Sequence, residues 1–175
     1  MPCAFALTSN YVIDCKDSLG GLTEVFFMEF GNLTSYTEAS GVITALVKAA
    51  GKKFYKYELV RGTSMFVENI NASVENGSVF YQQELTVILN KLQVATRNEI
   101  LLLAKNRLVA VAKDNNGKYW ILGITKGVDI SAGSGASGTA EGDRSGYTLT
   151  FTGKEAAMAQ EVSSGVAAVL QTVGS

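Results

Sequence analysis

Residues 69–89 read NINASVENGSVFYQQELTVIL, and this stretch decides the fold class of the chain. At its centre, Asn76 and Gly77 supply the two positive φ angles that a type I′ hairpin turn requires. In the half that follows, apolar residues alternate with polar ones, so that one face of a strand would carry Val79, Tyr81, Leu85, Val87 and Leu89. We therefore predict a long β-hairpin here, with one face of its outgoing strand directed toward a core.

Further strands are predicted on both sides of this hairpin. Residues 22–30 carry apolar side chains on both faces, which indicates a strand buried on both sides. Residues 55–59 alternate apolar with charged side chains, as a half-exposed strand does. Residues 107–113 and 118–123 flank the turn sequence DNNG, which predicts a second hairpin in which Trp120 and Leu122 face the same layer.

The clearest strand covers residues 147–152. Tyr147, Leu149 and Phe151 alternate there with threonine without exception. Such a pattern predicts an apolar face toward the core and a hydroxyl face toward water or another subunit. Residues 131–146, just before this strand, contain five glycines and almost no apolar bulk. We therefore predict a loop over residues 131–146.

One helix is predicted over residues 97–105. Thr96 can accept a hydrogen bond from the N3 amide while Glu99 reaches back to the cap residue, which makes a capping box. Asn106 is a suitable end, because asparagine tolerates the left-handed conformation that closes many helices. Residues 39–50 also show helix-like spacing of apolar residues. This spacing does not decide between a short helix and a non-helical segment.

These elements predict a mainly β protein, an antiparallel β-sandwich or barrel with one short flanking α-helix and long hairpin or loop extensions. The length of 175 residues suits one domain. We assign residues 1–155 to a single β-rich structural domain. Residues 156–175 form a C-terminal tail with apolar residues at roughly helical spacing, interrupted by Gly165, which would form a helix or an arm to another subunit.

The composition argues against an enzyme. The chain has no histidine, which removes the commonest general base and metal ligand, and its carboxylates are scattered. Gly133, Gly135 and Gly138 form a literal G-x-G-x-x-G, but no helix or βαβ unit is visible after it, so a flexible loop is a better interpretation than a nucleotide site. We predict no catalytic residue, no cofactor and no metal.

Charge and cysteine content point to a protein that is soluble when made. The 15 Lys and Arg balance 16 Asp and Glu, which excludes a strongly basic nucleic-acid binder. Residues 1–7 do not resemble a secretory signal, and no stretch reaches the roughly 18 uninterrupted apolar residues of a membrane-spanning helix. Cys3 and Cys15 are either small buried residues or partners in a disulfide, and the sequence leaves both alternatives open.

Four passages carry a resemblance to a known family. They are residues 79–89 (VFYQQELTVIL), 97–105 (RNEILLLAK), 116–123 (NGKYWILG) and 146–153 (GYTLTFTG). Together they resemble small virion structural proteins of tailed bacteriophages that infect Bacteroidetes. Their order of hairpin, helix, hairpin, glycine-rich loop and threonine-rich strand is similar to that of phage tail tube proteins. The similarity covers roughly residues 69–155 and does not extend to the C-terminal tail.

The resemblance implies a virion structural protein that does no chemistry. Its copies would form stacked rings, usually hexameric, around a conduit through which DNA passes without sequence-specific contact. Partners would be further copies and other virion proteins, with no membrane, in the virion tail after assembly in the host cytoplasm. As subunit contacts we nominate Asn76, Gly77, Gly133, Gly135, Gly138, Asp143 and Arg144. As structural residues we nominate Thr96, Glu99, Trp120, Tyr147 and Phe151.

Two other functions stay open. An auxiliary capsid protein or a head-to-tail connector protein would have the same strand-rich, self-associating composition. A small nucleic-acid or carbohydrate binding module would use Lys52, Lys53 and Lys56 beside Tyr55 and Tyr57. A solvated basic strand face explains the same lysines. Acidic residues in the last third of the chain would steer head-to-tail stacking of copies.

Overall fold

Two β-sheets form the body of the protein in a computed structural model that describes residues 7–175. The first sheet contains β1 (Leu22–Glu29), β2 (Leu33–Ala39), β3 (Val42–Lys48), β4 (Tyr55–Glu58), β7 (Leu108–Asp114), β8 (Tyr119–Leu122) and β11 (Gln160–Val162). The second contains β5 (Met65–Ser73), β6 (Ser78–Asn90), β9 (Asp129–Ala136) and β10 (Gly146–Glu155). The helices are α1 (Val94–Lys105) and α2 (Ser164–Ala168), with a 3-10 turn at Phe30–Asn32.

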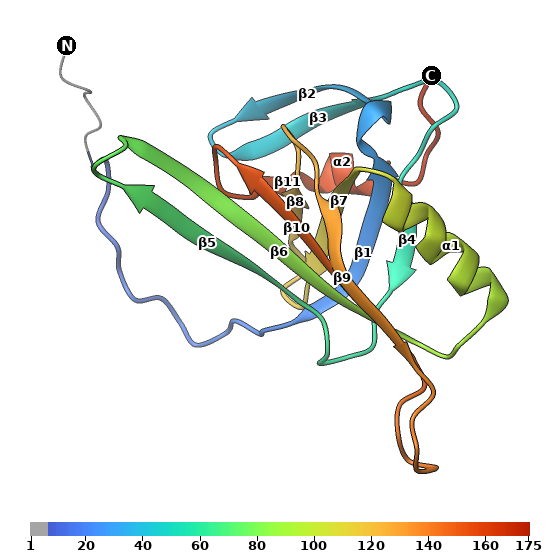
Figure 1. The fold of residues 1–175 in the computed structure, drawn as a ribbon. Coiled ribbons are helices and arrows are strands. Elements are labelled where there is room, and N and C mark those ends of the chain that lie inside the picture. Colours follow the sequence, from blue (N-terminus) through green and yellow to red (C-terminus); the bar gives the residue numbers. More distant parts are fainter. Residues whose placement is uncertain (1–6) are drawn as a thin grey trace.

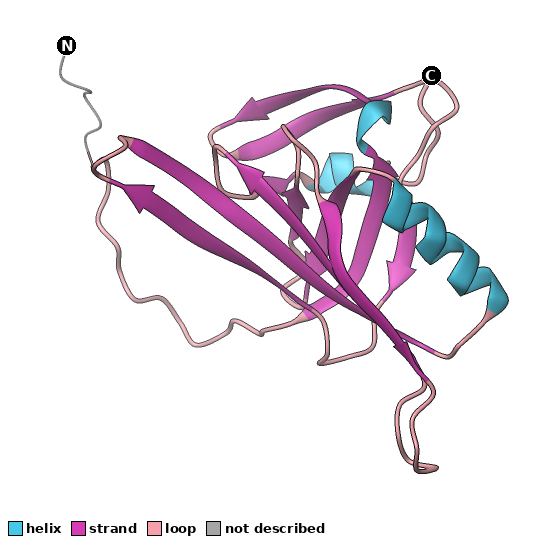
Figure 2. Cartoon of the chain, in the orientation of Figure 1, coloured by secondary structure: helices cyan, strands magenta, loops and turns pink. Residues whose placement is uncertain are grey.

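The two sheets are arranged as layers of a β-sandwich-like fold. The strand order is β2-β3-β11-β8-β7-β1-β4 in the first sheet and β5-β6-β10-β9 in the second (Figure 1). Strands dominate the molecule, and α1 flanks the sheets as its one long helix (Figure 2). The predicted mainly β fold with a flanking helix and long extensions is confirmed.

Apolar clusters cover both faces of the first sheet. Val25 and Phe27 of β1 pack with Phe151 of β10 in the cluster between the sheets. Phe26 and Met28 point the other way, into a second cluster that includes residues of β3, β7 and α2. Successive side chains of a strand alternate between faces, so the apolar run in β1 supplies both clusters. The predicted burial of this strand on both sides is confirmed.

The long hairpin is confirmed, but its turn differs from the prediction. β5 and β6 pair continuously from Met65 opposite Thr86 to Ser73 opposite Ser78. Four residues, 74–77, connect them, and of these only Gly77 has a positive φ, 59°. The type I′ turn predicted at Asn76 and Gly77 is therefore wrong, because such a turn needs two positive φ angles in a two-residue connection.

Residues 39–50 contain a strand and no helix. Ser40 and Gly41 connect β2 to β3 with φ angles of 54° and 79°, which is the signature of a type I′ turn. β3 then pairs with β2 on one side and with β11 on the other. Its β-branched residues Val42, Ile43 and Val47 favour this extended conformation, which explains why the helix-like spacing did not produce a helix.

Helix α1 begins three residues before the predicted start. Its N-cap residue is Gln93, with no hydrogen bond from the side chain, so Thr96 lies inside the helix and the predicted capping box of Thr96 and Glu99 is wrong. The helix does end at Asn106, but this residue is extended, with φ −108°, rather than left-handed. Its side-chain amide donates to the Leu102 carbonyl at 3.0 Å, which satisfies one open group of the last turn.

The first six residues of the predicted glycine-rich loop, 131–136, belong to a strand. β9 covers Asp129–Ala136 and pairs with β10, with Gly133 opposite Leu149 and Gly135 opposite Tyr147. Glycine has no side chain to bury, so backbone hydrogen bonds to the edge of β10 hold these residues in the strand. The loop is confined to residues 137–145, and the prediction of a loop from residue 131 is wrong.

The C-terminal tail packs against its own chain. β11 lies inside the first sheet, antiparallel to β8 and parallel to β3. α2 provides the short helical part, and Val166 and Leu170 are buried in the second cluster. Residues 160–170 therefore belong to the same core as residues 22–155. The parallel pair of β11 and β3 departs from the otherwise antiparallel pattern that was predicted.

Candidate assembly surfaces

Within residues 7–175, no group of His, Cys, Asp and Glu is arranged to hold a metal ion. Gly133 and Gly135 of the G-x-G-x-x-G sequence lie in an edge strand, so no helix N-terminus follows them for a phosphate. No helix of the described chain combines the length and apolar character that a membrane crossing needs. The surface of the protein is where candidate functional features gather.

The tip of the β5–β6 hairpin exposes apolar side chains. The hairpin projects beyond the body of the molecule at the upper left of Figure 1. Val74 at the tip is 99% exposed, and Ile70 and Val79 beside it are also exposed. Val79 was expected on the core face with Leu85 and Val87, but only the latter two are buried, because the strand continues past the other sheet. The nominated contacts Asn76 and Gly77 lie at this projecting tip.

An extended N-terminal arm, residues 7–20, is the second exposed feature. It forms no helix or strand, and within the described chain it is held mainly at its inner end, where the side chain of Asn116 bonds both the amide and the carbonyl of Leu19. Tyr11 is 93% exposed and Ile13 87% exposed. The prediction that Cys15 is a small buried residue is wrong, because Cys15 is exposed. Cys3 lies outside the described residues. No sequence pattern predicted this arm.

Loop 137–145 projects at the other end of the second sheet and is ordered by its own contacts (Figure 1). The Asp143 carboxylate accepts hydrogen bonds from the amides of Thr139 and Ala140 at 2.9 and 2.8 Å. These bonds hold the pKa of Asp143 below its usual range. Arg144 donates to the Thr148 hydroxyl at 2.8 Å. Gly138, Asp143 and Arg144 therefore lie together in this loop, away from Asn76 and Gly77.

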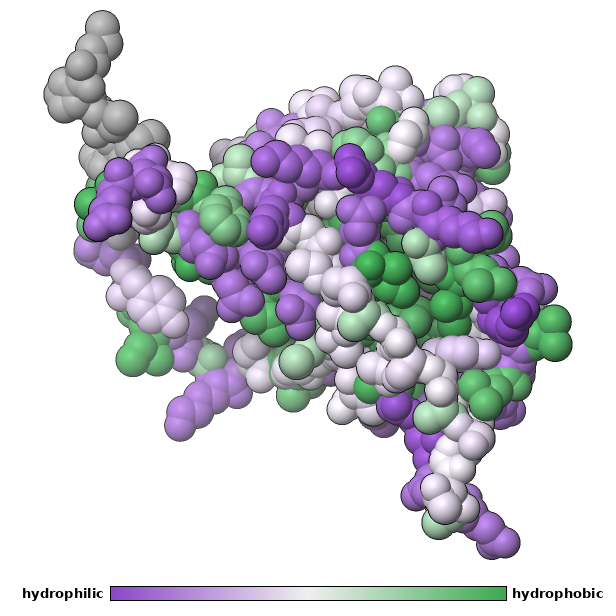
Figure 3. All heavy atoms as spheres, viewed as in Figure 1, coloured by the Kyte–Doolittle hydropathy of each residue, from purple (hydrophilic) through white to green (hydrophobic). Residues whose placement is uncertain are grey.

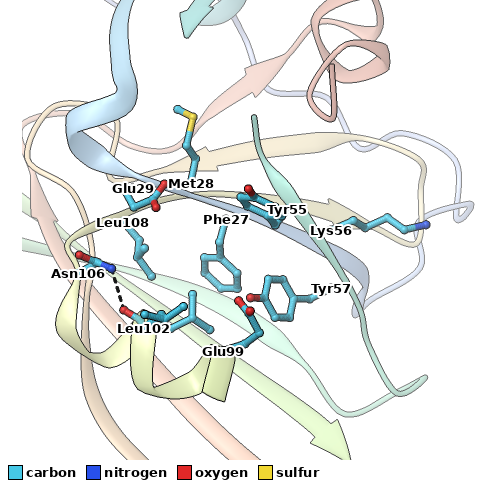
Figure 4. Close-up of a pocket in the computed structure, with 11 residues that line it drawn as sticks. Phe27, Met28, Glu29, Tyr55, Lys56, Tyr57, Glu99, Leu102, Asn106 and Leu108 are labelled. Carbon is cyan, nitrogen blue, oxygen red and sulfur yellow. Dashed lines mark hydrogen bonds between the residues drawn. The ribbon is translucent and has the colours of Figure 1, made fainter. Parts of the chain in front are cut away.

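Helix α1 lies between β4, an edge strand of the first sheet, and β9, an edge strand of the second. It forms a groove with each of them. The β4 groove, between α1 and β4, has a volume of about 410 Å³. Figure 4 shows Tyr57 and Phe27 on one side of it and Glu99 and Leu102 of α1 on the other. Glu29 and Lys56 also line this groove, so charged groups surround an apolar floor.

Tyr57 and Glu99 meet in the β4 groove. The Tyr57 ring stands edge-on to Phe27, with ring centroids 5.3 Å apart and an interplanar angle of 78°. Burial, the negative charges of Glu99 and Glu29, and a hydrogen bond to Glu99 together raise the pKa of Tyr57 to about 12. The phenol therefore stays protonated at neutral pH. Glu99, nominated for a helix cap, faces this groove instead.

The β9 groove, between α1 and β9, is larger and more apolar. Its volume is about 490 Å³, and its lining includes Leu101 and Ala104 of α1 and the glycines Gly133 and Gly135. Figure 3 shows apolar side chains gathered over α1 and the adjoining surface. Leu101 is 44% exposed there. A single charged residue, Arg97, is among the groove's lining residues.

The lysines near Tyr55 and Tyr57, considered for nucleic-acid or carbohydrate binding, and the nearby Lys48 have different surroundings. Lys48 is buried and donates to the carbonyls of Val169 and Thr172 at 2.6 and 2.5 Å. Lys56 forms ion pairs with the carboxylates of Glu24 and Glu58 at 3.5 and 3.0 Å. The Lys53 ammonium lies 5.4 Å from the centroid of the Tyr55 ring, and no ion pair within residues 7–175 involves Lys52 or Lys53.

Polar links between the layers were missed by the sequence analysis. Gln83 is only 2% exposed, and its side chain accepts from the Gly123 amide at 2.9 Å. Glu155 is also buried and accepts from the amides of Thr125 and Lys126 at 3.3 and 2.8 Å. An alternating strand pattern does not signal them, because each is a polar residue on an apolar face. They join the second sheet to the loop after β8.

The nominated structural residues all lie in ordered elements. Phe151 is fully buried, and Tyr147 packs at the margin of the same cluster. Trp120 of β8 shares a strand face with Leu122, as predicted from the spacing. Its indole donates to the Asp114 carboxylate at 3.1 Å and so joins the strand to the turn of its own hairpin.

Comparison with known proteins gives no match. No protein-family model, no curated protein and no solved structure matches the chain.

Proposed function

We propose that this chain is a structural subunit of a tailed-bacteriophage virion, a tail tube protein whose copies assemble into stacked rings around a conduit for DNA. The observation that carries the proposal is the exposure of apolar side chains on projecting parts of the fold. Tyr11 and Ile13 of the arm and Val74 of the hairpin tip are almost fully exposed. Apolar side chains this exposed on projecting segments gain free energy when another protein covers them, because burial removes apolar area from water.

The shape of the second sheet supports a wall-forming role. The hairpin tip projects from one end of this sheet and loop 137–145 from the other (Figure 1). Both edge strands, β5 and β9, pair with only one described strand. An open strand edge is a template for pairing with another chain. Copies related head to tail would use such unlike ends and edges, and a head-to-tail arrangement closes into a ring where the rotation permits it.

The outer face of the second sheet is suited to a passage for DNA. Thr148, Thr150 and Thr152 lie on this face, opposite the core residues of β10, and Thr150 stands across from Thr86 of β6. The hydroxyls of Ser131 and Thr152 are 2.7 Å apart. Clustered lysines and arginines on such a face would bind phosphates and hold the DNA. Glu84, across from Thr152, and Lys154, further along β10, carry opposite charges on the same face, so we expect DNA to move past it.

Electron microscopy of the purified full-length chain tests this function. Rings or tubes with a central channel, together with light scattering that reports a closed oligomer, are the expected result. A chain that stays monomeric at all concentrations contradicts the proposal. Labelling of the chain in an assembled virion then separates a tail position from one on the capsid or at the connector.

A further inference from the structure

We infer that the N-terminal arm of one copy adds as a β-strand to the free edge of β9 in a neighbouring copy and places its apolar side chains in the β9 groove. This inference rests on the proposed self-assembly and identifies the occupant of one of its surfaces. Within residues 7–175, the arm has no strand partner and the second edge of β9, beside the groove, pairs with no strand.

The arm has the pattern of a strand that lacks a partner. Tyr11, Ile13 and Cys15 fall on one side of an extended chain, and the other side carries the polar residues at 10, 14 and 16 together with Val12. No strand within residues 7–175 pairs with it. Exposed Tyr11 and Ile13 gain free energy when they leave water, and main-chain hydrogen bonds to an edge strand satisfy the backbone.

β9 offers an edge on which such a strand fits. It pairs with β10 on one side, and no other strand of the described chain takes its second side. Gly133 and Gly135 have no side chains to fill the groove, and a Cβ atom on either would approach the Leu149 or the Tyr147 side chain. The groove therefore stays open beside β9, with Leu101 of α1 exposed along its other wall.

Charge distinguishes the β9 groove from the β4 groove. The β4 groove is lined by the carboxylates of Glu29 and Glu99 and by Lys56, whose ammonium already pairs with Glu24 and Glu58, so the groove would repel the aspartates of the arm. In the β9 groove the charged group is Arg97, which forms no ion pair within residues 7–175. The arm carries Asp14 and Asp17, and one of them can pair with this guanidinium at the end of the groove.

The direction of the arm favours a neighbouring copy over the same chain. The arm leaves the start of β1 and runs past the β5–β6 hairpin, on the side of the molecule away from α1 (Figure 1). Extended chain covers about 3.3 Å per residue, so residues 7–20 span roughly 45 Å. That reach is sufficient to cross to an adjacent subunit of a ring.

Cysteine cross-linking between two separately purified variants tests the contact. In a background of Cys3→Ser and Cys15→Ser, one copy carries Ile13→Cys and the other carries Leu101→Cys on the β9 side of α1. The matched control copy carries Leu102→Cys, the next residue, which lines the β4 groove. Because each chain has one cysteine, a mixed disulfide dimer, identified by peptide mass, reports contact between copies only.

The inference expects mixed dimers of Ile13→Cys with Leu101→Cys in the assembled sample and few with Leu102→Cys. Preferential cross-linking to Leu102→Cys overturns it in favour of the β4 groove. Assembly without either cross-link also overturns it while the proposed function stands. A sample that never assembles contradicts the proposed function itself.

Serine substitutions in the arm give a second readout that does not depend on cross-linking. Tyr11→Ser with Ile13→Ser removes the apolar side of the arm and is expected to weaken self-association at least about tenfold. Val12→Ser is the matched control, since Val12 is also exposed but lies on the other side of the extended arm. Equal weakening by both variants, measured by sedimentation velocity, overturns the inference.

Discussion

The ring centroids of Phe27 and Phe151 lie 4.8 Å apart, with the rings tilted by 39°, and this contact joins the two sheets. Phe27 belongs to β1 in the first sheet and Phe151 to β10 in the second. Phe27 also meets Tyr57 of the edge strand β4. One aromatic row therefore runs from the second sheet, through the centre of the sandwich, to the β4 groove.

Replacing Phe151 with alanine is expected to destabilise the fold by about 3 to 5 kcal/mol, because the fully buried ring leaves a cavity between the sheets. Urea unfolding followed by intrinsic fluorescence measures this change. Thr150→Ala is the matched control, since Thr150 lies on the outer face of the same strand and its loss is expected to cost less than about 1 kcal/mol. Equal costs for the two variants would contradict the assignment of Phe151 to the core.

Lys48 holds the C-terminal segment in place. Its buried ammonium donates to the carbonyls of Val169, Leu170 and Thr172, just beyond α2. Lys48→Met keeps the length of the side chain but leaves these carbonyls without a donor, which is expected to cost about 2 to 3 kcal/mol. Hydrogen exchange should show faster exchange in residues 164–172, whereas exposed Lys52→Met should leave it unchanged. Unchanged exchange in Lys48→Met contradicts this role.

Tyr57 gives the fold an alkaline limit. Unfolded tyrosine loses its proton near pH 10, whereas Tyr57 in the fold has a pKa of about 12. Between these values the unfolded state binds fewer protons than the folded state, so the free energy of unfolding falls as pH rises. Tyr57→Phe is expected to remove this part of the fall. Unfolding measured from pH 9 to 12 tests it, with Tyr55→Phe on the same strand as control; equal slopes for wild type and Tyr57→Phe would contradict it.

The strands with strong alternation could be predicted from the sequence, and the features that depend on distant residues could not. β10 and the apolar face of β6 follow from their period of two, since that pattern is local. β9 could not be predicted, because its glycines carry no apolar pattern and form a strand only through the edge of β10. The start of α1 was also mispredicted, because its N-cap residue, Gln93, makes no side-chain hydrogen bond and carries no capping pattern in the sequence.

The candidate surfaces were only partly predictable. Asn76 and Gly77 mark a projecting tip because turn residues are found in hairpin connections. The arm escaped prediction, since Tyr11 and Ile13 look like ordinary core residues until the fold shows them exposed. The burial of Lys48 escaped prediction for a similar reason, because its hydrogen-bond partners lie more than 120 residues away in sequence. Contacts between residues so far apart in the sequence leave no local pattern from which to predict them.

Asp143 is expected to keep loop 137–145 ordered. Its carboxylate accepts from the amides of Thr139 and Ala140, which lowers its pKa, so this order is present above the usual aspartate range near pH 3.9 and is lost only as pH falls through the lowered value. Asp143→Ala removes the acceptor and should speed exchange of these two amides about tenfold. Glu141→Gln, in the same exposed loop, should leave both amides protected. If Asp143→Ala leaves their exchange unchanged, the loop is ordered by other contacts.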